Sequence, residues 1–255
     1  MSLKLFDLTG RRALITGSSQ GIGLALAGGL AAAGAEVVLN GRDAAKLDAA
    51  VSGLRAAGAK ASGSAFDVTD EAQIAQAVGR IEREHGAIDI LVNNAGMQYR
   101  APLEEFPAEK FRELFRVNVE SMFLVGKAVA RHMIPRQRGR IVNIGSVQSE
   151  LARPTIAPYT ATKGAVKMLT RGMCGDWAKH GLQVNGIGPG YFKTLLNQAL
   201  VDDPVFSGWL EKRTPAGRWG TVDELVGAVV FLASDAASFV NGHMLYVDGG
   251  VTAVL

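Results

Sequence analysis

The sequence predicts an α/β protein, a single domain in which one parallel sheet is covered by helices on both faces. Short apolar runs alternate with longer segments of helical periodicity along the whole chain. Glycine is abundant, with 31 residues and no regular repeat, as many tight turns between strands and helices would require. The 255 residues suit one large domain, and an apolar content of 48% supplies a sizeable core. We therefore expect a doubly wound sheet that binds its ligands at the carboxyl ends of the strands.

Seven segments are expected to form this sheet, because each is a short, mostly apolar run followed by a turn or a helical pattern. In chain order they are 12–17, 36–40, 60–66, 88–92, 141–145, 183–187 and 244–247.

Helices are predicted between these strands, where apolar residues recur at helical spacing. Asp43 is a candidate N-cap, and Gly34 and Gly58 are candidate C-terminal ends. The predicted helices are 22–33, 43–57, 70–84, 107–133, 157–180 and 222–234. No linker or repeat divides the chain, so 1–255 is expected to be one domain. The segment 199–220 is polar, aromatic and poorly periodic, and we expect a substrate lid around 191–220.

Composition argues against several classes of protein. The net charge is +3 and the basic residues are scattered, which does not favour nucleic-acid binding. The single cysteine, Cys174, lies in a predicted helix as a core residue; it cannot form an internal disulfide and fits a reducing cytoplasm. We find no signal peptide and no apolar stretch long enough to cross a membrane. The four histidines are scattered without ligand spacing, so no metal site is expected.

A glycine-rich turn links the first predicted strand to the first helix, reading TGSSQGIG over 16–23. Its glycines allow a tight turn and let the backbone approach a pyrophosphate at the N-terminus of the helix. The spacing differs from the usual dinucleotide fingerprint and from a P-loop. A turn that only packs helix on strand is the alternative. The candidate cofactor contacts here are Gly17, Ser19, Gln20, Gly21, Ile22 and Gly23.

The end of the second strand indicates which nucleotide binds. An NAD site usually has an acidic residue there for the ribose 2′-hydroxyl, but this strand ends in Asn40-Gly41-Arg42. The planar guanidinium of Arg42 can bind a 2′-phosphate, whereas a carboxylate would repel it. We therefore expect NADP rather than NAD; a solvated surface arginine is the alternative.

Polar and small residues end the third and fourth strands. Asp67-Val68 follows the third strand, where Asp67 is placed either to cap a helix or to accept from an adenine amino group. The fourth strand ends in Asn93-Asn94-Ala95-Gly96, whose small residues would let a sugar and a phosphate lie close to the backbone. Val68, Asn94, Ala95 and Gly96 are accordingly candidate cofactor contacts.

The segment after the fifth strand carries the candidate chemistry. Tyr159 and Lys163 are one helical turn apart and face the same way if a helix starts near Pro158. An ammonium beside a phenol favours the phenolate and is expected to lower the tyrosine pKa toward the working range. Ser146, just past the strand, can hydrogen-bond the same reacting oxygen. Together they can move a proton onto or off a carbonyl oxygen while a hydride moves on carbon.

In this order and spacing, the motifs resemble the short-chain dehydrogenase/reductase family over essentially the whole chain, including Asn118 and the segment from Pro189 to Thr194. The resemblance implies a Rossmann fold in which Tyr159 is the general acid/base and Ser146 polarises the reacting oxygen. It implies that Lys163 holds the nicotinamide ribose and that Asn118 anchors a water leading from Lys163 to solvent. It also implies that Tyr159, Lys163, Pro189, Gly190, Phe192 and Thr194 contact the cofactor.

A closer resemblance is to the gluconate 5-dehydrogenases, a subfamily that interconverts D-gluconate and 5-keto-D-gluconate, mostly with NADP. It rests on MQYR at 97–100, VQSEL at 147–151, PGYFKT at 189–194 and KRTPAGRWG at 212–220. An anionic polyol needs a cation for its carboxylate and hydrogen-bonding groups for its hydroxyls. We expect this substrate to contact Arg100, Ser146, Gln148, Arg153 and Tyr159. Further candidates in the pocket or the lid are Gln98, Glu150, Tyr191, Lys193 and Trp209.

Two other functions are considered. A 3-oxoacyl-carrier-protein reductase would share the whole scaffold and would reduce an acyl thioester. A non-catalytic nicotinamide sensor is disfavoured because Asn118, Ser146, Tyr159 and Lys163 are all present. The family resemblance implies a homotetramer, or a homodimer, built on the long predicted helix and on 226–250. The apolar character of 111–133 on more than one face suits such burial.

Overall fold

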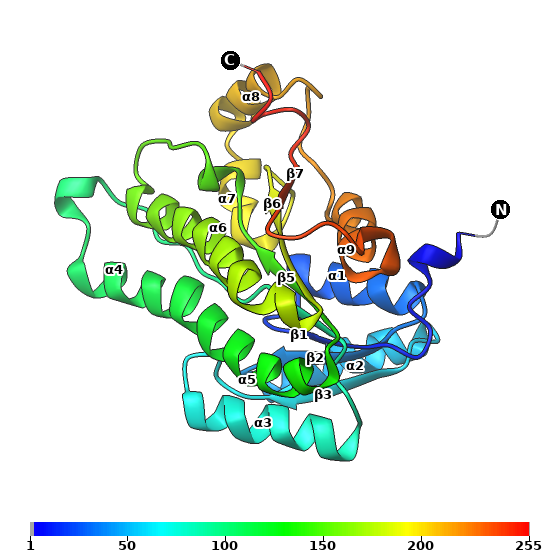
Figure 1. Cartoon of the computed structure of the whole chain (residues 1–255). Coiled ribbons are helices and arrows are strands. Elements are labelled where there is room, and N and C mark those ends of the chain that lie inside the picture. Colours follow the sequence, from blue (N-terminus) through cyan, green and yellow to red (C-terminus); the bar gives the residue numbers. More distant parts are fainter. Residues whose placement is uncertain (1–2, 255) are drawn as a thin grey trace.

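The structure is a computed structural model that describes residues 3–254. Its sheet has seven parallel strands in the order β3-β2-β1-β4-β5-β6-β7 (Figure 1). The order changes direction between β1 and β4, which creates the crevice where doubly wound folds bind ligands. The strands are β1 (Arg12–Ile15), β2 (Glu36–Gly41), β3 (Ala61–Ala65), β4 (Ile90–Asn93), β5 (Gly139–Ile144), β6 (Leu182–Pro189) and β7 (Met244–Val247).

Helices cover both faces of this sheet (Figure 1). One face is covered by α1 (Gly21–Ala32), α2 (Ala44–Ala56) and α9 (Val226–Ala233). The other is covered by α3 (Glu71–Glu84), α4 (Ala108–Phe115), α5 (Ser121–Arg136) and α6 (Ala157–Trp177). Two short helices, α7 (Gln198–Val201) and α8 (Pro204–Arg213), lie in the connection between β6 and β7.

The alternation of side chains along each strand divides the core into two layers. In β1, Ala13 and Ile15 face the layer under α1, α2 and α9, whereas Leu14 faces the layer under α3 and α5. All three side chains are fully buried. Burial on both faces explains why the central strands read as continuous apolar runs and not as an alternating pattern.

The predicted fold is confirmed, and the predicted elements are present with shifted ends. Asp43 caps α2 by accepting from the backbone N–H of Lys46 at 3.1 Å. The predicted helix 107–133 is α4 and α5 joined by a π-helical turn, Arg116–Glu120. The prediction missed α7 and α8, because short helices have no clear apolar stripe. The Asp203-Pro204 pair that starts α8 is an N-cap signal that could have revealed it.

None of the helices between residues 3 and 254 combines the length and the apolar character that a membrane crossing needs.

Candidate active site

The loop between β1 and α1 is tight on one side and open on the other. Gly17 and Gly21 both have φ of +60°, a conformation that favours glycine. A Cβ on Gly17 would lie 2.8 Å from Ala95 Cα, and one on Gly23 would lie 2.5 Å from the carbonyl oxygen of Gly17. A Cβ on Gly21 would meet nothing within 4 Å. The glycines therefore pack the loop against its neighbours and leave the N-terminus of α1 accessible to an anion.

Side chains from three strands hold this loop. The Thr16 hydroxyl oxygen accepts from the backbone N–H groups of Asn94 and Ala95, at 3.0 and 3.1 Å. The Asn94 amide donates to the carbonyl oxygens of Thr16 and Gly17. Asn40, only 1% exposed, accepts from the Gly17 N–H and donates to two carbonyls at the end of β3. Sequence reasoning missed this role of Asn40, whose only signal is a polar residue at the end of an apolar strand.

Arg42 lies at the edge of this crevice beside Asp67. Its side chain is 77% exposed, and its nearest contact with the Asp67 carboxylate is 3.9 Å. Asp67 accepts from the Thr69 backbone N–H and hydroxyl, both at 2.8 Å. Burial opposes ionisation of Asp67 most strongly, but the Thr69 hydrogen bonds and the Arg42 charge together lower its pKa. The pair thus offers an ionised acceptor and an exposed guanidinium just after β3 and β2, respectively.

Other predicted cofactor residues lie at the carboxyl ends of β3 and β6. A Cβ on Gly190 would lie 2.7 Å from Asp248 Cα, so Gly190 is needed for close packing after Pro189. The Thr194 hydroxyl is buried and has no hydrogen-bond partner among the described residues, as expected of a group that binds a ligand. Val68 and Phe192 have buried side chains, so their contacts with a cofactor would come from the main chain. Three features fit the phosphate groups of a dinucleotide: the open N-terminus of α1, the Arg42 guanidinium and the Thr194 hydroxyl.

Ser146, Tyr159 and Lys163 come together at the carboxyl end of β5. Lys163 lies one turn after Tyr159 on α6, and its Nζ is 5.7 Å from the centroid of the tyrosine ring. Nζ donates to the Ile144 carbonyl at 2.8 Å, which holds the ammonium at the end of β5. The Ser146 hydroxyl accepts from the Gln148 N–H at 3.1 Å and is a hydrogen-bond partner of the Tyr159 phenol.

The pKa of Tyr159 differs from the sequence-based expectation. Burial raises it above the ordinary value of 10.0, against the opposing effects of the Ser146 hydrogen bond and of the Arg100 and Arg153 charges. Burial also lowers the pKa of Lys163, to about 8. Proximity to Lys163 is therefore not enough to lower the tyrosine pKa, because both groups are desolvated. The cations that lower it here are the two arginines.

Asn118 sits in the π-helical turn between α4 and α5. Its amide oxygen accepts from the Met97 N–H at 2.8 Å, and its amide nitrogen donates to the Met97 carbonyl and to the Thr162 hydroxyl. Extra π turns in helices occur frequently at functional sites. Here the turn ties the segment after β4 to the helix that carries Tyr159 and Lys163.

Arg100 and Arg153 both lie near Tyr159 although they are far apart in the sequence, and both charges lower the pKa of Tyr159. The Ala101 N–H donates to the Thr155 carbonyl at 3.1 Å, which joins the two loops. Thr155 has φ of +70°, an unfavourable conformation for a residue other than glycine. The charge of Arg153 adds to burial in lowering the pKa of Arg100, so the two guanidinium groups act on each other. Neither forms an ion pair with an acidic residue between 3 and 254, and each has a buried Nε without a partner.

Gln148 connects the loop after Ser146 to Tyr191, which follows β6. It is 6% exposed, and its amide nitrogen lies 3.5 Å from the Tyr191 hydroxyl. Gln98 accepts from Arg100 at 3.1 Å. Glu150, which follows on the same loop, instead accepts from Lys167 and from the Tyr246 hydroxyl. Glu150 is thus engaged away from the two arginines.

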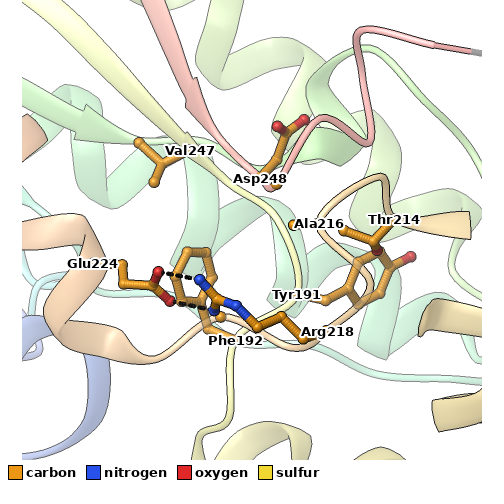
Figure 2. Close-up of a pocket in the computed structure, with 10 residues that line it drawn as sticks. Tyr191, Phe192, Thr214, Ala216, Arg218, Glu224, Val247 and Asp248 are labelled. Carbon is orange, nitrogen blue, oxygen red and sulfur yellow. Dashed lines mark hydrogen bonds and ion pairs between the residues drawn. The ribbon is translucent and has the colours of Figure 1, made fainter.

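A small pocket also lies at the base of the segment 191–220 (Figure 2). Figure 2 shows the Arg218 guanidinium paired with the Glu224 carboxylate across it, through contacts of 2.9 and 2.7 Å. Glu224 also accepts from the Thr221 N–H, which closes a capping box before α9. Tyr191 lines this pocket, but Ser146, Tyr159 and Lys163 do not. The pocket is therefore separate from the Ser146, Tyr159 and Lys163 side chains.

Within residues 3–254, no cluster of three or more histidine, cysteine or acidic side chains is placed to hold a metal ion.

A doubly wound sheet with a glycine loop at its switch point and a serine, tyrosine and lysine at the end of β5 defines a class: Rossmann-fold oxidoreductases that use a nicotinamide dinucleotide. Residues 17–252 match a family model described as Enoyl-(Acyl carrier protein) reductase. The chain belongs to the short-chain dehydrogenase/reductase family.

Several of the similar proteins are named for the oxidation of gluconate or the reduction of its keto form. A gluconate 5-dehydrogenase from Gluconobacter oxydans (strain 621H) is 64% identical over 251 residues, covering 98% of both chains. A 5-keto-D-gluconate 5-reductase from Escherichia coli (strain K12) is 54% identical over 247 residues, covering 97% of both. The crystal structure of a gluconate 5-dehydrogenase from Burkholderia cenocepacia J2315 in complex with NADP and tartrate has a TM-score of 0.98 at 60% identity, covering 100% of both chains.

Proposed function

We propose that this chain is an NADP-dependent gluconate 5-dehydrogenase that interconverts D-gluconate and 5-keto-D-gluconate. The observation that carries the proposal is the pair Arg100 and Arg153 beside Tyr159, two cations without an acidic partner among the described residues. A buried guanidinium needs a counter-ion, and a carboxylate suits its planar fork. The relatives named for this reaction match the chain over nearly their whole length.

In this proposal Tyr159 carries the proton of the reaction. NADPH, when bound, supplies the hydride that the carbonyl carbon accepts. As negative charge builds on the carbonyl oxygen, Tyr159 donates its proton to that oxygen and the Ser146 hydroxyl stabilises the charge. In the oxidising direction Tyr159 takes the proton from the substrate hydroxyl. Arg100 and Arg153 favour the phenolate that each turnover requires, in addition to binding the carboxylate.

Lys163 and Asn118 support this step. The Lys163 ammonium lies one turn from Tyr159 and would hold the nicotinamide ribose. Asn118 would anchor a water that returns protons from solvent to Lys163. Arg42 would bind the 2′-phosphate, and its exposure and its long contact with Asp67 leave it able to turn toward a ligand. The relative solved with NADP supports the choice of this cofactor over NAD.

We further propose that the chain is one domain with a lid at 191–220 and that it assembles as a homotetramer, or a homodimer, in the cytoplasm. Phe111, Phe123 and Met168, on α4, α5 and α6, are 44%, 45% and 59% exposed and suit burial against another copy. Sedimentation equilibrium tests the assembly, and a monomer at micromolar concentration would contradict it.

The function is tested by NADPH oxidation with 5-keto-D-gluconate, run beside an acetoacetyl thioester and with NADH as a control. Fast turnover of the keto acid with NADPH is the expected result. Reduction of the thioester alone would instead assign the chain to the 3-oxoacyl-carrier-protein reductases. Equal rates with NADH would contradict the role of Arg42.

A further inference from the structure

We propose that Phe206, on the lid helix α8, is a positioning residue that sets how tightly the enzyme binds the carboxylate of its substrate, acting through Arg153. The inference rests on the proposed function, because it concerns the same anionic substrate. Phe206 is not part of any motif described above. It lies 53 residues after Arg153 in the sequence (206 − 153). The lid would then contribute to substrate choice as well as covering the site.

The contact itself is a guanidinium over an aromatic face. The central carbon of the Arg153 guanidinium lies over the Phe206 ring, 5.4 Å from its centroid, within the range of a cation–π interaction. This contact holds Arg153 by the face of its guanidinium. One edge of the group also hydrogen-bonds to Tyr191. The remaining N–H groups, including the unpartnered Nε, can donate to a carboxylate. Arg100 is held differently, because it donates one N–H to Gln98. Of the two arginines, Arg153 is therefore the one oriented by the lid.

Phe206 is itself firmly placed. Asp203 caps α8 by accepting from the backbone N–H groups of Val205 and Phe206, at 2.9 and 3.2 Å, which fixes the first turn of the helix. The Phe206 ring packs against Tyr191, Trp209 and Trp219, with centroids 5.9, 5.3 and 6.1 Å away. These four side chains form an aromatic platform. Its position relative to β6 is fixed by Tyr191, whose hydroxyl also reaches Gln148.

The contact between Phe206 and Arg153 predicts how KM and kcat change when Phe206 is replaced. Without Phe206 the Arg153 guanidinium gains rotational freedom, and a carboxylate must then order it on binding. The loss should appear in KM for an anionic substrate. It should spare kcat, because F206L leaves the Arg153 charge that acts on Tyr159 in place. L-sorbose provides the comparison, since it has the same ketone and hydroxyl groups as 5-keto-D-gluconate with CH2OH in place of the carboxylate.

The test compares Phe206→Leu, which removes the aromatic face, with Phe206→Tyr, which keeps it, and with Val205→Ala as a control on the exposed side of the same turn. We expect F206L to raise KM for 5-keto-D-gluconate about fivefold, the size of a modest cation–π contact. Turnover at saturation and KM for L-sorbose should stay within about twofold. F206Y and V205A should behave like the wild type.

A double-mutant cycle with Arg153→Gln separates this role from general packing. If Phe206 acts through Arg153, F206L has no further effect on KM in the R153Q background. An equal rise in KM for both substrates, or an undiminished effect in that background, would overturn the inference while leaving the proposed function intact. If the wild-type enzyme did not turn over 5-keto-D-gluconate, the proposed function would fail, and this inference with it.

Discussion

The glycine loop after β1 and the region around Arg100 and Arg153, proposed to bind the cofactor and the substrate respectively, differ in how their polar groups are satisfied. In the loop, Thr16, Asn40 and Asn94 direct their side chains to backbone groups and hold the turn in its final shape. Arg100 and Arg153, by contrast, keep buried Nε atoms that have no partner between residues 3 and 254, and the charge of Arg153 lowers the pKa of Arg100. The side chains of the loop are thus already satisfied by the protein, whereas the two arginines are expected to gain from binding an anion. We therefore expect cofactor affinity to depend on the shape of the loop as well as on the Arg42 charge, and substrate affinity to depend mainly on charge.

The largest expected effect comes from replacing Tyr159, which is proposed to act between the bound cofactor and the bound substrate. Tyr159→Phe removes the proposed proton donor and keeps the ring, so kcat for 5-keto-D-gluconate should fall at least ~10²-fold. NADPH binding, followed by fluorescence titration, should change little because the glycine loop is untouched. Full turnover by Y159F would refute the proposed mechanism.

The next largest effect should be confined to binding of the substrate. Arg100→Gln leaves the substrate carboxylate with one guanidinium, so KM for 5-keto-D-gluconate should rise about 10- to 100-fold, the range for a charged hydrogen bond. Loss of this charge should also move the kinetic pKa assigned to Tyr159 upward, since Arg100 lowers it. Arg138→Gln, at an exposed site just before β5, is the matched control. A change of equal size with L-sorbose would argue against carboxylate recognition.

Cofactor binding can be altered at Arg42 without a change in the glycine loop after β1. Arg42→Asp replaces an exposed cation with an anion that repels a 2′-phosphate, and we expect the Kd for NADPH to rise by roughly tenfold or more. The Kd for NADH should change by less than about threefold. Arg138→Asp controls for net charge. Parallel losses for both nucleotides would remove Arg42 from the phosphate site.

The smallest effect is a pH dependence of stability in the cofactor-free protein. Burial lowers the pKa of Lys163 to about 8 from its ordinary 10.5, so between these values the unfolded chain binds more protons than the folded one. Stability from this group therefore rises as pH increases through that window. Urea unfolding at pH 7.5 and 9.5 should show a gain of roughly 1–2 kcal/mol that Lys163→Met lacks. An identical pH dependence in K163M would show that Lys163 is not desolvated.

Local patterns in the sequence account for much of the fold and of the cofactor loop. Apolar runs predict strands because parallel strands are buried on both faces, and the glycines at 17, 21 and 23 predict a tight turn because few other residues fit there. The spacing of Tyr159 and Lys163 predicts a shared helix face for the same local reason.

Properties that depend on tertiary packing could not be predicted. The predicted direction of the Tyr159 pKa shift is wrong. The spacing of Tyr159 and Lys163 indicates a nearby charge, but it does not show that Tyr159 is buried, and burial outweighs the effect of nearby charges. The contact between Arg153 and Phe206 joins distant segments, one of them on a helix too short to leave a periodic pattern. Asn40 looks like an ordinary polar residue at a strand end until its three hydrogen bonds are known.

The central claim is that the pocket recognises its substrate by charge, and one ratio tests it most directly. We would measure kcat/KM for 5-keto-D-gluconate and for L-sorbose with NADPH, in the wild type and in the variant that combines R100Q and R153Q. The account predicts that the wild type prefers the keto acid by ~10³-fold or more and that the double variant loses most of this preference while still reducing L-sorbose. A preference that survives in the double variant would contradict the account.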